Sequence, residues 1–134
     1  MVQPSALHVE DRDDGVRVLT LSNPARRNAL DDSQVARLDE ALASAPGRAR
    51  AVLIQGAGGA FCSGYDLNML AAPTKDRLPD DALMACLARL EALPLPSVAL
   101  VQGPAFGAGF DLSASCDFRV GAEDALFSMP PARL

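Results

Sequence analysis

The sequence predicts an α/β fold built on a mostly parallel β-sheet. Two short apolar runs, AVLIQG (51–56) and SVALVQG (97–103), have the length and composition of buried strands, and each leads into a glycine-rich turn. Helical patterns separate and follow these runs, and strands alternating with helices at this spacing favour parallel pairing through crossover connections. Because ligands of such sheets bind beyond the carboxyl ends of the strands, both turns lie where a site is expected.

The chain opens with a predicted β-hairpin. Residues 7–9 and 16–21 flank Asp14-Gly15, a dipeptide suited to the positive φ angles of a tight hairpin turn. This pair of strands is expected to be antiparallel.

A first helix is predicted to begin after Asp31. Asp31 can cap its N-terminus, and Gln34 occupies the capping-box position three residues later. Val35, Leu38 and Leu42 recur at helical spacing on one face, so this face is expected to meet the core.

The strand at 51–56 is expected to be covered on both faces, because it is apolar throughout. The next turn, GAGGAFCSG, is followed by a Pro/Asp-rich stretch (71–81) that is expected to be exposed and mobile. A second helix is predicted from Asp81, with Leu83, Leu87 and Leu90 on its apolar face. After the strand at 97–103, the turn GPAFGAG leads into a short helix, FDLSASC.

Composition limits the classes of function. The 134 residues are predicted to form a single domain (1–134), and a formal charge of −5 disfavours nucleic acid as a partner. No run approaches the ~20 apolar residues of a membrane span. The start of the chain lacks the features of a secretory signal, so a cytoplasmic location is expected. Cys62, Cys86 and Cys116 fit neither a disulfide framework nor a zinc site, and no metal is expected.

The two glycine turns suit the stabilisation of an oxyanion. Backbone N–H groups at tight turns offer donors where negative charge develops, without reorganisation of side chains. AFCSGYDL (60–67) and GPAFGAGFDL (103–112) each follow a strand, so one donor from each turn could reach a single oxygen.

Four motifs resemble the crotonase (enoyl-CoA hydratase/isomerase) superfamily in order and approximate spacing: NPARRNAL (23–30), AFCSGYDL (60–67), VQGPAFGAGFDLSASCDFRV (101–120) and ALFSMPP (125–131). The resemblance implies a crotonase-like core of ββα repeats, covering the front portion of a typical member and stopping before its C-terminal helices. It implies an acyl-CoA thioester as ligand, with coenzyme A entering as part of the substrate and no separate cofactor. It also implies a trimer-based homo-oligomer, to which the later helices of the family contribute.

The resemblance assigns roles to individual residues. The backbone N–H groups of Ser63 and Ala108 would form the oxyanion hole, with Gly107 in the second turn. Ser63, Gly64, Tyr65 and Asp66 would border the thioester and pantetheine. The substrate-binding set is completed by Arg26 and Arg27, beside the CoA nucleotide.

Two departures concern the acid–base groups. Family hydratases use two glutamates, whereas this chain has Asp111 at the first position and Pro131 at the second. Proline transfers no proton, so hydration by two carboxylates is incomplete, and Asp111 is the candidate catalytic residue for a double-bond shift or a related enolate reaction.

Structural interpretations stand beside these roles. Asp111 and Asp66 could be helix-start or solvated residues, and the two arginines could be surface charges. Cys62 lacks a histidine partner, and Ser63 lacks the G-x-S-x-G frame of a hydrolase. A dinucleotide fold is disfavoured because Phe61 and Leu112 stand where a third glycine belongs. Two hypotheses remain: an enzyme of enolate chemistry, or a catalytically silent acyl-CoA-binding or assembly subunit.

Overall fold

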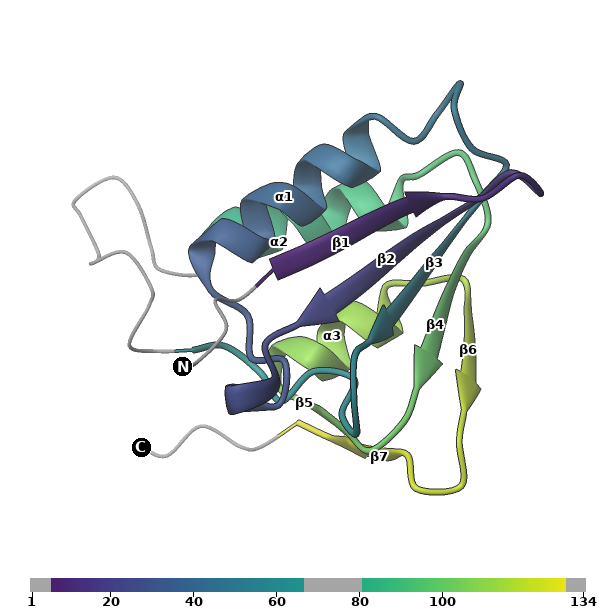
Figure 1. Ribbon diagram of the computed structural model, residues 1–134. Helices are drawn as coiled ribbons and strands as arrows, with labels where there is room; N and C mark the ends of the chain where they lie inside the picture. The colour runs from purple at the N-terminus through teal and green to yellow at the C-terminus, as the bar shows by residue number, and fades with distance from the viewer. Residues whose placement is uncertain (1–5, 67–80, 130–134) are drawn as a thin grey trace.

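The computed structural model describes residues 6–66 and 81–129, which form a mixed β-sheet with helices and a small second sheet (Figure 1). The elements are β1 (Ala6–Asp11), β2 (Val16–Ser22), the 3-10 turn η1 (Pro24–Arg26), α1 (Asp32–Ala43), β3 (Ala51–Gly56), α2 (Asp81–Glu91), β4 (Ser97–Val101), β5 (Pro104–Phe106), α3 (Ala108–Ala114), β6 (Phe118–Gly121) and β7 (Leu126–Ser128).

The main sheet has the strand order β1-β2-β3-β4-β6. β1 pairs with β2 in the antiparallel sense, and the remaining neighbours are parallel, which confirms the predicted hairpin and the mostly parallel sheet. The carboxyl ends of β2, β3, β4 and β6 therefore lie at one edge, the lower edge in Figure 1. The glycine turns, α3, β5 and β7 gather there.

Helix α1 begins as the sequence predicts. The Asp31 carboxylate accepts a hydrogen bond from the Gln34 N–H at 2.9 Å, and Val35, Leu38 and Leu42 are buried. Gln34 departs from the capping box, because its side-chain amide donates to the Ala6 carbonyl instead and so ties α1 to β1.

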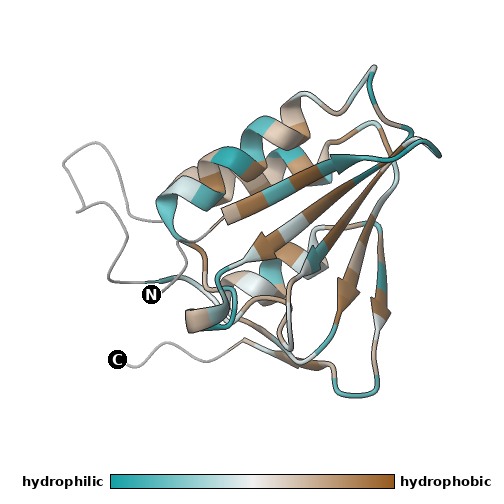
Figure 2. Cartoon of the chain, viewed as in Figure 1, coloured by the Kyte–Doolittle hydropathy of each residue, from teal (hydrophilic) through white to brown (hydrophobic). Residues whose placement is uncertain are grey.

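Strand β3 is covered less evenly than expected. Val52 and Ile54 are fully buried, whereas Ala51, Leu53 and Gln55 on the other face are only half-buried. The apolar core therefore lies mainly between one face of the sheet and helices α1 and α2, which carry the buried leucines predicted for them. Figure 2 shows the apolar residues concentrated on the strands and the inward sides of these helices.

Strands β5, β6 and β7 are not among the elements that the sequence predicts. Each has three or four residues, and β6 and β7 are exposed along their whole length, so neither carries the buried alternation that marks a strand. The stretch expected to be mobile (71–81) lies, except for Asp81, outside the described residues, as does Pro131.

Candidate functional site

The two predicted glycine turns are joined to each other. The Cys62 N–H donates to the Pro104 carbonyl at 3.1 Å, and the Phe106 N–H donates to the Cys62 carbonyl at 3.0 Å. Gly109 packs directly on this segment, since a Cβ at this position would lie 2.2 Å from the Cys62 carbonyl oxygen. The second turn therefore approaches the first only because residue 109 has no side chain.

Asn28 fastens a third loop, residues 23–30, to the same place. Its side-chain amide donates to the carbonyls of Ala57 at 2.9 Å and Ala60 at 2.8 Å, and its Oδ1 accepts from the Asn23 N–H at 2.8 Å. Asn28 is 1% exposed and has a φ of 62°, a left-handed conformation that asparagine tolerates better than most residues. Its role was not predicted, although an asparagine in a turn is a signal for this left-handed conformation.

The Ser63 N–H, which the resemblance assigns to the oxyanion hole, is hydrogen-bonded within the protein. This N–H donates to the Arg27 carbonyl at 3.1 Å, and the Ser63 hydroxyl donates to the Arg26 carbonyl at 2.8 Å. Both donors of Ser63 are therefore used to hold the arginine loop against the first turn.

The peptide group between Gly64 and Tyr65 has the opposite orientation. The Gly64 carbonyl accepts from the Leu30 N–H at 2.8 Å, and the Leu30 carbonyl accepts from the Asp66 N–H at 2.8 Å. In a trans peptide the C=O and N–H point in opposite directions. The Tyr65 N–H therefore points away from Leu30.

Ala108 supplies the corresponding group of the second turn. It is the first residue of α3, so its N–H has no acceptor within the helix. No hydrogen-bond acceptor for it is found within residues 6–66 and 81–129. Gly107, which precedes it with a φ of 54°, is held by donating its own N–H to the Ser128 carbonyl of β7 at 2.9 Å.

Asp111 lies one helical turn beyond Ala108 on α3. It is half-buried, and burial raises the pKa of its carboxyl above the ordinary value. Within the described parts of the chain its carboxylate takes part in no hydrogen bond or ion pair. A carboxyl group in this condition is suited to exchanging a proton with a ligand.

The two arginines differ in their surroundings. Arg26 Nε lies 3.3 Å from Asp66 Oδ2, and the Asp66 side chain is 3% exposed, which favours the structural interpretation of Asp66. Arg27 is exposed and lines a hollow of about 350 Å³ together with Pro24, Ala57, Gly59, Ala60 and Pro104. Arg27 is thus open to an anionic ligand, while Arg26 is engaged within the protein.

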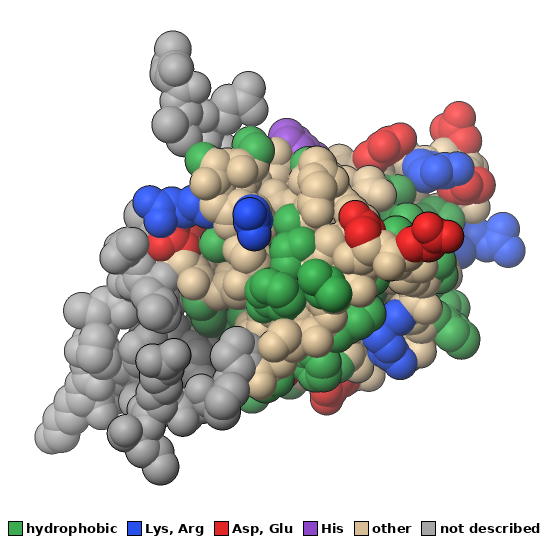
Figure 3. Space-filling view, turned by 90° about the horizontal axis from the view of Figure 1, so that it is seen from below, with side chains coloured by type: hydrophobic (Ala, Val, Ile, Leu, Met, Phe, Trp, Pro, Cys, Tyr) green, Lys and Arg blue, Asp and Glu red, His purple; other side chains and the backbone are tan. Residues whose placement is uncertain are grey.

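Figure 3 views the molecule from below, toward the carboxyl edge of the sheet. Hydrophobic side chains gather near the middle of this face, and both Lys/Arg and acidic side chains lie around them toward both ends. The face that holds the joined turns therefore offers both apolar contact and local positive charge to a ligand.

The cysteines are buried free thiols. Burial raises the pKa of Cys62 and Cys86 to about 12 and that of Cys116 to about 11, which excludes a reactive thiolate at neutral pH. In the described ranges, no group of three or more His, Cys, Asp or Glu could hold a metal ion. None of the described helices is long and apolar enough to cross a membrane.

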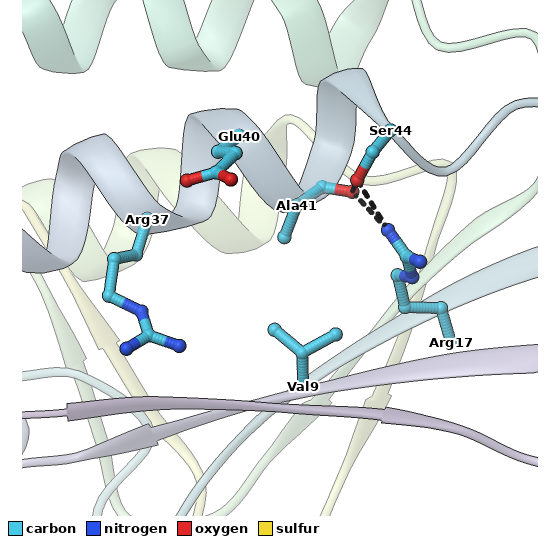
Figure 4. A pocket seen from close by; sticks show the side chains of 6 residues that line it. All are labelled: Val9, Arg17, Arg37, Glu40, Ala41 and Ser44. Atoms are coloured by element: carbon cyan, nitrogen blue, oxygen red, sulfur yellow. Dashed lines mark hydrogen bonds between the residues drawn. The ribbon is translucent and has the colours of Figure 1, made fainter.

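Another hollow, of about 430 Å³, lies between β1 and α1 (Figure 4). None of the predicted site residues lines it. Its wall includes Arg17, whose guanidinium donates to the Ala41 carbonyl at 2.9 Å and the Ser44 hydroxyl at 2.8 Å and pairs with Asp11. The donors of this guanidinium serve to join the hairpin to α1.

Comparison with known proteins gives consistent sequence similarities. Residues 11–134 match the family model described as enoyl-CoA hydratase/isomerase. Ethylmalonyl-CoA decarboxylase of Danio rerio is 42% identical over 124 residues, a match that covers 86% of this chain and 40% of that protein. Probable enoyl-CoA hydratase echA6 of Mycobacterium bovis is 40% identical over 123 residues, a match that covers 90% of this chain and 49% of that protein. The chain thus spans less than half the length of these two relatives.

Solved structures agree with the sequence matches. A member of the enoyl-CoA hydratase/isomerase family superposes with a TM-score of 0.87 at 30% identity, covering 98% of this chain and 52% of that one. An enoyl-CoA hydratase from Polaromonas sp. JS666 superposes with a TM-score of 0.82 at 36% identity, covering 90% of this chain and 49% of that one. These matches confirm the predicted crotonase-like fold.

Proposed function

This chain belongs to the enoyl-CoA hydratase/isomerase family, and we propose that it binds an acyl-CoA thioester and stabilises the enolate of its acyl group. The observation that carries the proposal is the junction of the two glycine turns at Cys62, which brings the peptide group before Tyr65 and that before Ala108 to one edge of the sheet. The thioester oxygen would accept hydrogen bonds from the N–H groups of Tyr65 and Ala108, in place of the pair expected from the sequence.

Backbone donors suit this chemistry because they are already oriented before the reaction. As the thioester carbonyl becomes an enolate, negative charge moves onto its oxygen, and donors fixed at that point stabilise the charged form more than the neutral one. Removing one donor of this kind typically costs about 3 kcal/mol of transition-state stabilisation. The close packing of Gly109 on Cys62 supports such rigidity.

Asp111 would transfer the proton at the α-carbon. Its raised pKa enlarges the protonated fraction near neutral pH compared with an exposed aspartate. In a double-bond shift, the Asp111 carboxylate accepts a proton from one carbon and its acid form returns a proton to another. In the loss of a carboxylate from the α-carbon, the C–C bond breaks, CO₂ leaves, and the Asp111 acid protonates the enolate.

These reactions need one acid–base group, whereas hydration needs a second to activate water. Pro131 stands where the family resemblance implies the second group. The name of the Danio rerio relative, ethylmalonyl-CoA decarboxylase, therefore makes the decarboxylation of a 2-carboxyacyl-CoA the first reaction to test. The second candidate function is a catalytically silent acyl-CoA-binding subunit. Pro131 favours it as well, because proline cannot transfer a proton.

Binding and turnover separate the two candidates. The purified chain is mixed with butyryl-CoA, crotonyl-CoA or ethylmalonyl-CoA, while its thermal midpoint, the enoyl absorbance and the release of CO₂ are followed. Thermal stabilisation together with turnover supports the enzyme, provided that Asp111→Asn abolishes the turnover. Asp13→Asn, at the exposed hairpin turn, is the matched control. Stabilisation without turnover supports the silent subunit. No stabilisation by any of the thioesters rejects both.

A further inference from the structure

A groove between α2 and α3 has Asp111 in its wall. Its wall on α2 consists of Met84, Leu87, Ala88 and Glu91, and its wall on α3 consists of Asp111, Ala114 and Ser115, which together enclose about 270 Å³. The α2 residues recur at the three- and four-residue spacing of one helix face, and so do the α3 residues. The groove is therefore lined by one face of each of these two helices.

The middle of the groove is apolar. Leu87 is 6% exposed and belongs to the core, whereas Met84, one helical turn earlier on the same face, is 55% exposed. A flexible methionine left open beside a buried leucine provides a surface that an aliphatic chain can cover.

The far end of the groove is polar. Glu91 Oε1 lies 3.5 Å from Ser115 Oγ, so the two side chains meet across the groove. Ser115 follows Asp111 by four residues, which corresponds to about 6 Å along a helix. An acyl chain that starts beside Asp111 reaches the Glu91 carboxylate after only a few carbon atoms.

We propose that this groove receives the acyl chain of the substrate, and that Glu91 selects short chains whose far end carries a hydrogen-bond donor, either a hydroxyl or an ammonium group. The inference rests on the proposed function, because the proposed thioester site lies at the start of the groove. Asp111 touches the reacting atoms, whereas Glu91 determines specificity.

The charge of Glu91 and the cost of removing water from it determine which chain ends should bind most tightly. A carboxylate that accepts a hydrogen bond from a ligand hydroxyl, or pairs with an ammonium, gains a charge-assisted interaction. A methyl terminus offers Glu91 no partner while displacing water from it, and a terminal carboxylate adds repulsion between like charges. A hydroxyl or ammonium terminus should therefore bind about tenfold more tightly than a methyl terminus, the ratio expected for one hydrogen bond to a charged group.

The test uses four CoA thioesters that share a six-carbon chain: hexanoyl-CoA, ω-hydroxyhexanoyl-CoA, ω-aminohexanoyl-CoA and adipoyl-CoA. Their dissociation constants are measured by calorimetry with the unaltered chain, with Glu91→Leu and with Glu91→Gln. The matched control is Glu40→Leu, an exposed glutamate of α1 that lines the hollow of Figure 4. Acetyl-CoA, whose acyl group is too short to reach Glu91, reports whether each variant keeps the thioester site.

The expected result is that the amino and hydroxy thioesters bind about tenfold more tightly than hexanoyl-CoA, with adipoyl-CoA the weakest. Glu91→Leu should make hexanoyl-CoA the tightest ligand without changing the dissociation constant of acetyl-CoA. Glu40→Leu should keep the order of binding found for the unaltered chain. Glu91→Gln should keep the preference for the hydroxyl and lose that for the ammonium. Equal binding of the four thioesters, or tightest binding of hexanoyl-CoA to the unaltered chain, overturns the inference and leaves the proposed function standing. If no thioester binds, both are overturned.

Discussion

Replacing Asn28 by alanine should loosen the loops that form the candidate site. The side chain makes three buried hydrogen bonds, to Ala57, Ala60 and Asn23. Each contributes about 1 kcal/mol net, which gives about 3 kcal/mol for the three. Alanine also tolerates a φ of 62° less well than asparagine, which adds about 1 kcal/mol. Asn28→Ala should therefore lower the free energy of unfolding by about 4 kcal/mol.

Urea unfolding followed by far-UV circular dichroism measures this loss, because the chain has no tryptophan for fluorescence. With a urea m-value of about 2 kcal/mol/M, the midpoint should fall by about 2 M. Asn28→Gly separates the two contributions, since glycine accepts the positive φ but lacks the amide, and should lose about 3 kcal/mol.

The matched control is Arg27→Ala. Arg27 has a similar φ of 51°, and its side chain is exposed, so this change should alter stability by less than about 0.5 kcal/mol. A loss of less than about 1 kcal/mol in Asn28→Ala, or an equal loss in Arg27→Ala, would contradict the role of the Asn28 hydrogen bonds. Either result would mean that the loop is held by something other than the Asn28 amide.

Three further predictions concern charge and burial. Burial raises the pKa of Asp111 in the folded chain. The contribution of this residue to the free energy of unfolding is therefore most favourable below the ordinary aspartate pKa and is lost as pH rises through the raised pKa. Asp111→Asn should therefore unfold at a higher urea concentration than the unaltered chain at pH 7, and the difference should vanish toward pH 3. Arg17→Met should cost about 3 kcal/mol in the same assay, because the Ala41 carbonyl and Ser44 hydroxyl lose buried donors, and a loss below about 1 kcal/mol would contradict this. The three thiols should resist a thiol reagent at pH 8 until urea unfolds the chain, since burial holds their pKa values at about 11 to 12, and rapid labelling of the folded chain would show that they are accessible.

The sequence predicted the features of the fold that depend on local pattern. The Asp14-Gly15 hairpin, the Asp31 cap and the leucine faces of both long helices need only neighbouring residues, and the structure has all of them. Strands β6 and β7 could not be predicted in this way, because they are short and exposed. Their pairing is a property of the folded chain.

The candidate site illustrates the same limit. Motifs placed the two glycine turns correctly at one edge of the sheet, but they could not decide which amide of the first turn faces the second. The N–H groups of Ser63 and Tyr65 point in different directions, which are set by the hydrogen bond that Ser63 donates to the Arg27 carbonyl and the one that Leu30 donates to the Gly64 carbonyl. The role of Gln34 was misjudged for a similar reason, since its partner lies on β1.

The directions of three backbone amides decide whether the joined turns can bind a thioester oxygen. ¹⁵N-labelled chain is titrated with hexanoyl-CoA until its thermal stabilisation is saturated, and the amide proton shifts of Ser63, Tyr65 and Ala108 are followed. Hydrogen bonding to the thioester oxygen should move the Tyr65 and Ala108 signals downfield, while Ser63 stays in place because its N–H is held by the Arg27 carbonyl. A downfield shift of Ser63 with Ala108 unmoved, or no shift at Tyr65 and Ala108 in the saturated complex, would contradict the account.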